Sequence, residues 1–245
     1  MIKVENISVM NLDNAIRGLR NPMNSWDKSD SFNCYIAECE ECPYFDKERS
    51  DNGDFGCTSP LVGHSDCDYY PEWFAVGPKD IELCQKMLNA GDSDSKFMRQ
   101  IFVSMDITVP AYFAAEFDTY KVGTTRNSCS FMHKGTEKEF ERSDFSTEDM
   151  DETSLKCLDN IIHRLNELRQ VYLESKNAEI FLTIRKLLPQ SYNYRFTWTG
   201  SFANLRNMYF QRKNHRLPEW REFCKILEDL PYGKELICYK KEKSE

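Results

Sequence analysis

The chain has 245 residues, of which 40% are hydrophobic and 13% aromatic. This is enough apolar material for a packed core, which excludes a disordered chain. The 40 acidic residues outnumber the 32 basic ones, and the formal net charge of −8 disfavours a protein that coats nucleic acid or an anionic membrane.

The expected organisation is a single domain over residues 1–245, with residues 30–75 as a Cys-rich insertion. No run of about 18 apolar residues is present, so no membrane-spanning segment is predicted. The N-terminal sequence MIKVENISVMNLDNAIRG lacks the charged and then apolar layout of a secretory signal. We therefore expect a cytoplasmic protein.

Hydrophobic periodicity, together with the positions of proline and glycine, predicts the elements of the N-terminal half. The segment RQIFVSMDITVP alternates and is rich in β-branched residues, which is typical of a strand. Pro78 followed by an amphipathic run up to Gly91 indicates a helix, because proline suits a first turn and glycine a helix end. The predicted elements are a strand over 2–9, a helix from Asn11, a helix over 78–91, a strand over 99–110, a helix over 111–121 and a polar loop over 123–135.

From Thr153 the pattern is strongly helical, since apolar residues recur at intervals of three and four. An acidic, solvated loop is expected just before this helix, over residues 141–153. The other predicted elements are a helix over 178–188, an extended segment over 192–199, and helices over 201–213 and 217–230. Helices dominate and strands are a minority, so the predicted fold class is α+β with α/β-type layers.

The ten cysteines are distributed unevenly, and five of them fall within residues 34–67. A Cys-x-x-Cys pair and two later thiols offer enough soft ligands to close a tetrahedral zinc shell. The candidate ligands are Cys39, Cys42, Cys57 and Cys67, with Cys34 and His64 in reserve. This segment has little core of its own, so a structural zinc would hold its shape. The alternative is a loop with coincidental free thiols.

A loop dense in small polar residues follows the helix predicted over 111–121. Its residues are Gly123, Thr124, Thr125, Arg126, Asn127, Ser128, Cys129 and Ser130. Backbone amides and hydroxyl groups in such a loop, next to Lys121 and Arg126, suit a phosphate. A solvated surface loop is the alternative interpretation.

Three arginines stand out in the C-terminal part of the chain. Arg195 lies in an aromatic extended segment, and Arg206 and Arg212 are six residues apart on one predicted helix. A guanidinium among aromatic rings is costly to bury without an anionic partner. A nucleotide offers a phosphate for the guanidinium and a base for the aromatic face. Alternatively, these arginines lie in solvent with their stems over an aromatic core.

Residues 91–134 and 187–220 resemble the two signature regions of the flavin-dependent thymidylate synthases. In that family a strand ends in an Ala-Pro-like step. A helix follows with a Gln and then Arg-His-Arg, and the next loop has the form Ser-x-x-Glu-x-Ser-x-Arg-Tyr. The matching residues here are Val109, Pro110, Glu116, Thr119, Tyr120, Lys121, Thr124, Asn127, Cys129, Phe131 and Met132.

The second region of the family has Leu-Pro, a Thr-Arg-Phe-x-Trp-Thr strand and a helix with Asn and Arg. The counterparts here are Leu188, Pro189, the segment YRFTWT over 194–199, Asn207 and Arg212. The first region departs further from the family, because only Lys121 keeps a charge from Arg-His-Arg and the loop's Arg-Tyr is absent. Lysine cannot reproduce the guanidinium fork, so phosphate binding there is weaker unless Lys121 and Arg126 substitute.

The resemblance implies a thymidylate synthase-like fold, with a central antiparallel or mixed sheet flanked by long helices. It implies methylation of dUMP to dTMP with a carbon from methylenetetrahydrofolate, FAD as the hydride donor and NADPH as the reductant of the flavin. The active sites would form between the subunits of a homotetramer. No nucleic-acid polymer or membrane is expected as a partner.

The resemblance also implies site residues. The substrate-binding set is Glu116, Lys121, Thr124, Asn127, Ser128, Cys129, Ser130, Arg195 and Arg212. Arg195 and Arg212 are also the implied catalytic residues, since they would polarise the uracil. The cofactor-binding set is Tyr120, Lys121, Asn207 and His215.

Two other functions fit the altered loop. One is a transferase that places another one-carbon group, such as hydroxymethyl, on a pyrimidine nucleotide. The other is a non-catalytic nucleotide-binding protein on the same fold, with the Cys-rich segment as its contact surface. Cys129 leaves a further alternative open, because a thiol beside Lys121 and Arg126 can attack pyrimidine C6. The simpler interpretation of Cys129 is a small residue in place of serine.

Overall fold

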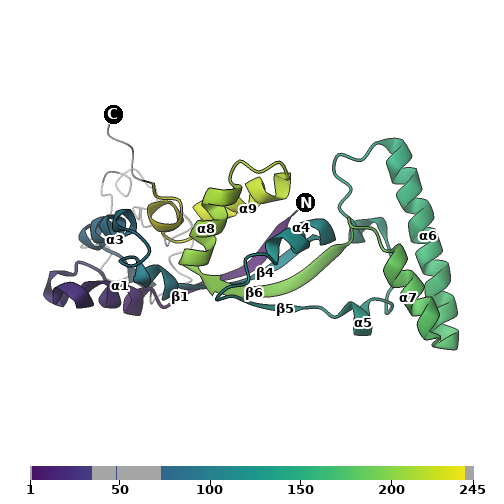
Figure 1. Cartoon of the computed structure of the whole chain (residues 1–245), viewed down its shortest axis with the longest axis horizontal. Coiled ribbons are helices and arrows are strands. Elements are labelled where there is room, and N and C mark those ends of the chain that lie inside the picture. The colour runs from purple at the N-terminus through teal and green to yellow at the C-terminus, as the bar shows by residue number, and fades with distance from the viewer. Residues whose placement is uncertain (1, 35–47, 49–72, 241–245) are drawn as a thin grey trace. The chain divides into compact units, whose positions relative to one another are not determined.

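The computed structural model describes residues 2–34, residue 48 and residues 73–240 (Figure 1). The chain divides into two compact units. Unit 1 contains Met1–Ile7 and Ser104–Thr199, and unit 2 contains Ser8–Val103 and Gly200–Glu245. No helix in the described ranges has both the length and the apolar character needed to cross a membrane.

The helices and strands follow the predicted order. The helices are α1 (Leu12–Arg20), α3 (Pro78–Ala90), α4 (Ala111–Phe117), α5 (Phe131–Lys134), α6 (Glu152–Ser175), α7 (Ala178–Leu187), α8 (Phe202–Arg212) and α9 (Pro218–Glu228). The strands are β1 (Lys3–Met10), β2 (Phe32–Cys34), β3 (Trp73–Ala75), β4 (Phe102–Pro110), β5 (Thr125–Ser128) and β6 (Asn193–Ser201). The strand predicted from residue 99 begins at Phe102, and the helix predicted up to residue 121 ends at Phe117.

Four strands form an open sheet in the order β1-β4-β6-β5. At one edge, β5 pairs antiparallel with β6, with Thr125 opposite Thr199 and Ser128 opposite Phe196. The prediction of a loop over residues 123–135 is therefore wrong in part, because β5 and α5 lie within it. The sequence TRNS has no apolar alternation and becomes a strand through its pairing with β6. The predicted α+β fold class, a sheet accompanied by helices, is confirmed.

The sheet of unit 1 has two different faces, because successive side chains of a strand point to opposite sides. Phe196 and Trp198 of β6 are buried, and the ring of Phe117 in α4 lies 5.8 Å and 5.9 Å from them between centroids. Figure 1 shows α4 along this side of the strands. The opposite face carries polar side chains that are partly or fully exposed, and it is termed the polar face. Its residues on β4 and β6 are Ser104, Asp106, Thr108, Arg195, Thr197 and Thr199.

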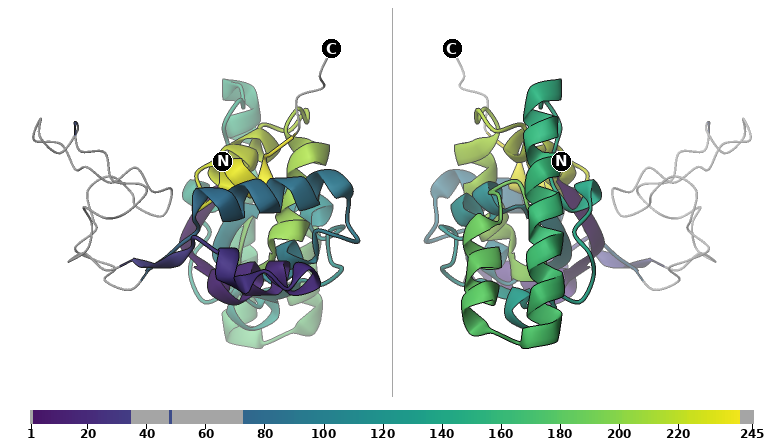
Figure 2. Two further views of the ribbon diagram at one scale, coloured as in Figure 1. Left: turned by 90° about the vertical axis from the view of Figure 1, so that its left-hand side faces the viewer. Right: turned by 90° about the vertical axis from the view of Figure 1, so that its right-hand side faces the viewer.

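A hairpin of α6 and α7 completes unit 1 (Figure 2). Each helix begins at a capping residue: Asp151 accepts a hydrogen bond from the backbone N–H of Ser154, and Asn177 accepts one from Glu179. The hairpin shares an apolar core with the segment before α6. The buried members of this core are Phe131, Phe140, Phe145, Leu158, Leu165, Leu168, Phe181 and Ile184.

The acidic segment before α6 is not the solvated loop predicted over residues 141–153. Phe145 in this segment is buried, and its ring centroid lies 5.5 Å from that of Tyr192. The backbone N–H of Ser146 donates to the carbonyl oxygen of Ser191 at 2.8 Å. These contacts fix the segment against the chain that leads into β6. Its Glu141, Glu148 and Asp149 are exposed, whereas the Asp144 side chain is only 14% exposed.

Unit 2 contains a buried ion pair between α1 and α3. Arg20 Nη2 lies 2.5 Å from Asp80 Oδ1, and the two side chains are 6% and 0% exposed. Ser29 and Ser31 donate their hydroxyl protons to Asp80 Oδ2 at 2.6 Å and 2.5 Å. Both carboxylate oxygens of Asp80 thus have partners, which a buried charge requires.

Part of the apolar core of unit 2 lies on α8, α9 and the C-terminal turn over residues 230–238. The fully buried side chains here include Phe202, Leu205, Met208, Trp220, Phe223, Leu227 and Tyr232. Ser201 and Asn204 form a reciprocal capping box at the start of α8. The Tyr232 hydroxyl accepts a hydrogen bond from the backbone N–H of Val76 at 2.7 Å, which ties the C-terminal turn to β3.

Candidate functional site

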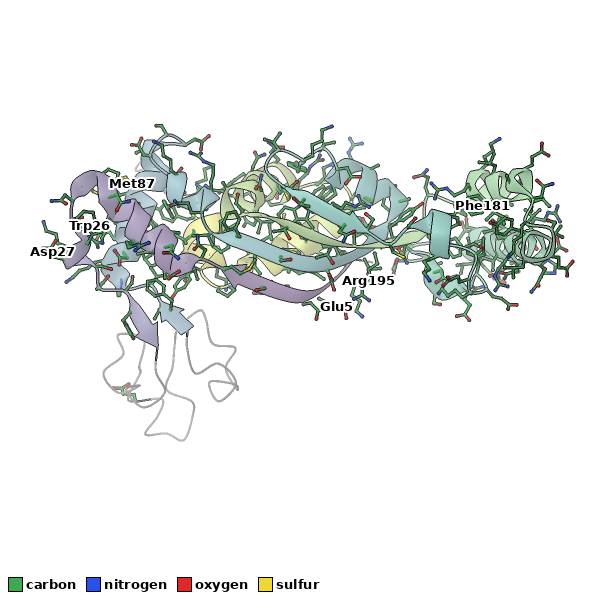
Figure 3. All side chains as sticks on the ribbon, turned by 90° about the horizontal axis from the view of Figure 1, so that it is seen from below. Glu5, Trp26, Asp27, Met87, Phe181 and Arg195 are labelled. Carbon is green, nitrogen blue, oxygen red and sulfur yellow. The ribbon has the colours of Figure 1, made fainter. Side chains whose placement is uncertain are left out.

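The polar face of unit 1 presents Arg195, the arginine that the sequence singles out. Its side chain is 57% exposed, and its Nη2 lies 3.3 Å from Asp106 Oδ2 on the neighbouring strand β4. Figure 3 views the molecule from the side away from α4 and shows Arg195 on this side of the sheet. The guanidinium is therefore held at one nitrogen and exposed at the rest, which suits an anion or a carbonyl group arriving from solvent.

Asp106 is itself fixed by donors from two strands. Thr197 Oγ1 donates to Asp106 Oδ1 at 2.5 Å, and Asn6 Nδ2 donates to Asp106 Oδ2 at 2.9 Å. These hydrogen bonds, first that from Thr197 and then that from Asn6, hold the pKa of Asp106 below its ordinary value of 3.8, with Arg195 contributing in the same direction. Asp106 is thus an anion at neutral pH and orients Arg195.

The predicted phosphate loop lies beside Arg195 through its second half. The register of β5 with β6 places Asn127 opposite Thr197, so Asn127 lies on the polar face. The exposed Cys129 follows directly after β5, and its backbone N–H donates to the carbonyl oxygen of Arg195 at 3.1 Å. Ser128 and Ser130 are exposed on either side of it. The structure therefore brings Asn127 and Cys129 close to Arg195, whereas Ser128 lies opposite Phe196, on the face that α4 covers.

Arg126 is less available than the sequence suggests. Its guanidinium carbon lies 3.8 Å from the centroid of the Phe196 ring, on the side of the sheet covered by α4. Its Nη1 lies 2.5 Å from Asp118 Oδ1, and its Nε donates to Ser128 Oγ at 2.8 Å. Because its charge already has a carboxylate partner, Arg126 is poorly placed to replace the missing phosphate-binding arginines.

The remaining predicted residues of this region cluster around the end of α4. The hydroxyl groups of Thr119 and Thr124 donate to the backbone carbonyls of Glu116 and Tyr120, at 2.7 Å and 3.1 Å. Glu116 and Tyr120 are half-buried. Lys121 is exposed, and within residues 2–34 and 73–240 it makes no hydrogen bond or ion pair. Lys121 is therefore a free cation at the entrance to the loop.

Asn207 in unit 2 borders a cavity of about 300 Å³. The cavity is lined by Leu88, Asp92, Ser95, Met98, Arg99, Ala203, Arg206, Asn207 and Phe210. The Asn207 side chain is exposed, and its Oδ1 accepts a hydrogen bond from Gln211 Nε2 at 2.8 Å. The amide donor of Asn207, the hydroxyl of Ser95 and the guanidinium of Arg99 give this cavity a polar wall, and Phe210 gives it an aromatic one.

Arg206, the third arginine of the sequence analysis, has a structural role at this cavity. Its Nη1 donates to the backbone carbonyls of Leu236, Ile237 and Tyr239, at 3.0, 3.0 and 2.6 Å. Burial lowers the pKa of Arg206 from its ordinary value. Nη1 of the guanidinium therefore caps the C-terminal turn.

Arg212 and His215, predicted in separate roles, are in direct contact at the end of α8. Arg212 Nη1 lies 2.9 Å from His215 Nε2, and its guanidinium carbon lies 4.9 Å from the centroid of the Trp220 ring. The other ring nitrogen of His215, Nδ1, accepts a hydrogen bond from the backbone N–H of Leu217 at 3.3 Å. Arg212 and His215 lie in unit 2 and Arg195 lies in unit 1.

The predicted zinc ligands Cys39, Cys42, Cys57 and Cys67 lie outside the described residues. Within the described part of the chain, no group of three or more His, Cys, Asp or Glu side chains is arranged to hold a metal ion. Sequence reasoning also missed Asp106, Thr197 and Asn6. One signal was present, since aspartate is depleted in strand interiors and Asp106 interrupts a β-branched strand.

Comparisons with protein-family models and with curated proteins give no match. Solved structures do match in fold. One is a crystal structure of thymidylate synthase X from Helicobacter pylori with FAD and dUMP, at 18% identity and a TM-score of 0.59, covering 97% of both chains. A second structure of the flavin-dependent enzyme from the same organism, also with FAD and dUMP, gives 17% identity and a TM-score of 0.59 over 96% of both chains. At this identity the likeness shows the fold, and the predicted thymidylate synthase-like fold is confirmed.

Proposed function

We propose that this chain is an FAD-dependent enzyme that binds dUMP and methylates it to dTMP. The observation that carries the proposal is Arg195, which Asp106 and Thr197 orient on an exposed polar face beside a loop of hydroxyl and amide groups. The fold likeness supports it, because the two neighbouring structures hold both FAD and dUMP. The acidic net charge is compatible with it, since one nucleotide needs only a few local cations.

The residues of unit 1 bind the nucleotide in this proposal. Arg195 donates to a carbonyl or phosphate oxygen of dUMP through the N–H groups that Asp106 leaves free. Asn127 and Ser130 supply neutral donors, and Lys121 supplies a second positive charge. Ser128 lies on the other face of the sheet, where its Oγ accepts from Arg126. Glu116 and Thr124 line the approach from α4. Cys129 lies next to Arg195 through its backbone and forms no covalent bond with the substrate.

The residues of unit 2 hold the flavin in this proposal. Asn207 and Arg99 on the cavity of about 300 Å³ fit a hydrogen-bonding ring edge or a phosphate, and Phe210 fits the face of a ring. The family resemblance also assigns Tyr120 and Lys121 of unit 1 to the cofactor. When bound, FAD supplies the hydride for the methylation, after reduction by NADPH, and methylenetetrahydrofolate supplies the carbon.

Arg212 and His215 act as a unit in this proposal. His215 contacts one nitrogen of Arg212 and so orients the guanidinium, which binds the substrate in this proposal. An arginine on Trp220 is also rigid, which favours a defined geometry at the uracil. We further propose a homotetramer with sites shared between subunits, and a structural zinc held by Cys39, Cys42, Cys57 and Cys67.

The first test is an absorbance spectrum and a zinc analysis of the purified full chain, followed by thermal melting with and without dUMP. A yellow protein with a flavin spectrum that dUMP stabilises supports the proposal. A colourless protein whose melting temperature neither FAD nor dUMP raises would overturn it. The zinc content separately tests the metal prediction.

A second candidate function is nucleotide binding without this turnover, or transfer of a different one-carbon group such as hydroxymethyl. Thr119, Lys121 and Phe131 favour it, because they stand where the resembling family has guanidinium groups. Mass spectrometry of the products from dUMP and from dCMP separates the cases. Tight dUMP binding without any product under reducing conditions would support the non-catalytic alternative.

A further inference from the structure

Unit 2 has a second polar cavity that the proposed function does not use. Two adjoining hollows, of about 360 Å³ and 450 Å³, share the residues Asn14, Arg17 and Trp26. The first hollow is also lined by Asp13, Ile16, Arg20, Ser29, Ser31 and Phe74, and the second by Gly18, Asn21 and Gln100. Each volume lies within the range of small-molecule pockets, about 300–1,000 Å³.

Trp26 presents a rigid aromatic surface to both hollows. The side chain is 52% exposed, whereas Trp198 and Trp220 are buried. The indole Nε1 donates to Asn21 Oδ1 at 2.7 Å, which fixes the orientation of the ring without covering it. Figure 3 shows Trp26 beside α1. An exposed, immobilised indole is suited to stacking on a planar ring, because little conformational entropy is lost when the ring binds.

Arg17 brings a positive charge to both hollows, and Asp13 brings a carboxylate to the first. Within the residues that the structure describes, Arg17 has no carboxylate partner, and its Nη2 donates to Asn14 Oδ1 at 2.8 Å. Asn14 Nδ2 in turn donates to Asn11 Oδ1 at 2.8 Å, and Asn11 Nδ2 donates to the carbonyl oxygen of Gln100 at 2.9 Å. This chain of amides holds the guanidinium in place while its other N–H groups remain available.

Gly18 and Gln100 lie in close contact in the wall of the second hollow. A Cβ atom at this position would lie 2.9 Å from the side-chain oxygen of Gln100. The glycine therefore lets the Gln100 amide approach α1 and line the hollow. A neutral amide, a guanidinium and an indole face thus converge on one opening.

We infer that the hollows around Trp26 and Arg17 bind a planar heteroaromatic ring that carries an anionic group. The ring stacks on Trp26, the phosphate or carboxylate accepts hydrogen bonds from Arg17, and the amides of Asn14 and Gln100 face the polar edge of the ring. The residues of this site all lie in unit 2, and the proposed function assigns none of them to dUMP or FAD.

The experiment measures binding to the full-length protein by titration calorimetry and by tryptophan fluorescence. The probes are AMP, which carries a phosphate, folic acid, which carries carboxylates, and adenosine, which carries neither. We expect AMP or folic acid to bind and to quench the exposed Trp26, and the stronger of the two identifies the anionic group. Binding of neither probe to the wild-type chain would overturn the inference.

Three variants test whether Trp26 and Arg17 bind the probes. Trp26→Ala should weaken binding at least about 10-fold, while Trp26→Phe should retain most of it, because a phenyl ring still stacks. Arg17→Gln should weaken the anionic probes about 10-fold and leave adenosine unchanged. Lys28→Gln is the matched control, since it removes an exposed charge nearby that lines neither hollow.

Failure of this inference can be distinguished from failure of the proposed function. Arg17→Gln and Trp26→Ala should leave the affinity for dUMP at the wild-type value, and each variant should melt within a few degrees of the wild-type chain. Probe binding that survives Trp26→Ala unchanged would show that the ligand lies elsewhere and would overturn the inference, whether or not the chain makes dTMP.

Discussion

Asp106 and Arg195 meet across strands β4 and β6 on the polar face of the sheet, with 3.3 Å between a carboxylate oxygen and a guanidinium nitrogen. The two residues are 89 positions apart in the sequence. Asp106 is bonded more tightly to Thr197, at 2.5 Å, than to Arg195. The carboxylate is therefore an anchor for the arginine and leaves most of the guanidinium open to a ligand.

The first prediction concerns the pH dependence of stability. Hydrogen bonds from Thr197 and Asn6 lower the pKa of Asp106 in the folded chain, so ionised Asp106 favours the fold. This contribution is fully present above the ordinary pKa of 3.8 and is lost as the pH falls through the lower pKa of the folded state. Asp106→Asn should thus melt at a lower temperature than the wild-type chain at pH 7, and the gap should narrow by pH 3.

A second variant controls for general damage to the sheet. Thr197→Val removes the strongest hydrogen-bond donor to Asp106 at nearly constant volume and changes no charge. In a chain that carries Thr197→Val, the loss of melting temperature caused by Asp106→Asn should therefore depend less on pH. A melting-temperature gap between the wild-type chain and Asp106→Asn that is equal at pH 7 and pH 3 would contradict this account.

The second prediction concerns nucleotide affinity. Arg195→Ala removes a charged donor from an exposed position, so it should weaken dUMP binding at least about 10-fold without lowering stability. Arg195→Lys should fall between this variant and the wild-type chain, because it keeps the charge and loses the fork. Calorimetric titration with dUMP measures both, and Arg164→Gln on α6, whose partner is Glu167, serves as a remote control. Equal affinities in all four proteins would exclude Arg195 from the site.

The third prediction concerns the buried ion pair of unit 2. Asp80→Ala leaves the guanidinium of Arg20 buried without its carboxylate, which should cost about 3–5 kcal/mol of unfolding free energy. The comparison is Arg142→Gln, which breaks an exposed pair with Asp159 and should cost about 1 kcal/mol or less. Urea denaturation measures both. A loss at Asp80 no larger than that at Arg142 would mean that the buried pair is not needed for the fold of unit 2.

The fourth prediction concerns Cys129. Its backbone N–H donates to the carbonyl oxygen of Arg195, so we expect Cys129 to act as a small residue and not as a nucleophile. Cys129→Ser should retain full turnover of dUMP in a product assay, while Cys129→Phe should lower it by crowding the loop. A loss of about 100-fold or more in Cys129→Ser would instead revive covalent attack on the pyrimidine.

Most helices and long strands could be predicted because their signals are local. Pro78 and Gly91 bracket α3, and the apolar spacing of α6 is repeated over many turns. The strand β5 could not be predicted, because Thr125–Ser128 has the composition of a loop and its pairing partner lies 70 residues later in β6. Its conformation depends on the order of strands in the sheet, which no local pattern encodes.

The candidate site was predictable only in part for the same reason. Arg195 could be identified because an arginine among aromatic residues is unusual. Asp106 and Asn6 could not, because each becomes a partner only when β1, β4 and β6 lie side by side. Arg126 and Arg206 are the opposite case, because the sequence indicates both as candidates for ligand binding. In the structure, Arg126 is paired with the carboxylate of Asp118, and Nη1 of Arg206 donates to three backbone carbonyls.

The most direct test of the central claim is a product assay. The full-length protein is incubated with dUMP, FAD, NADPH and methylenetetrahydrofolate, and the nucleotides are analysed by mass spectrometry. The account predicts dTMP, formed only when FAD is present and lost in Arg195→Ala. Failure of the wild-type chain to form dTMP from dUMP under these conditions, despite bound FAD, would contradict it.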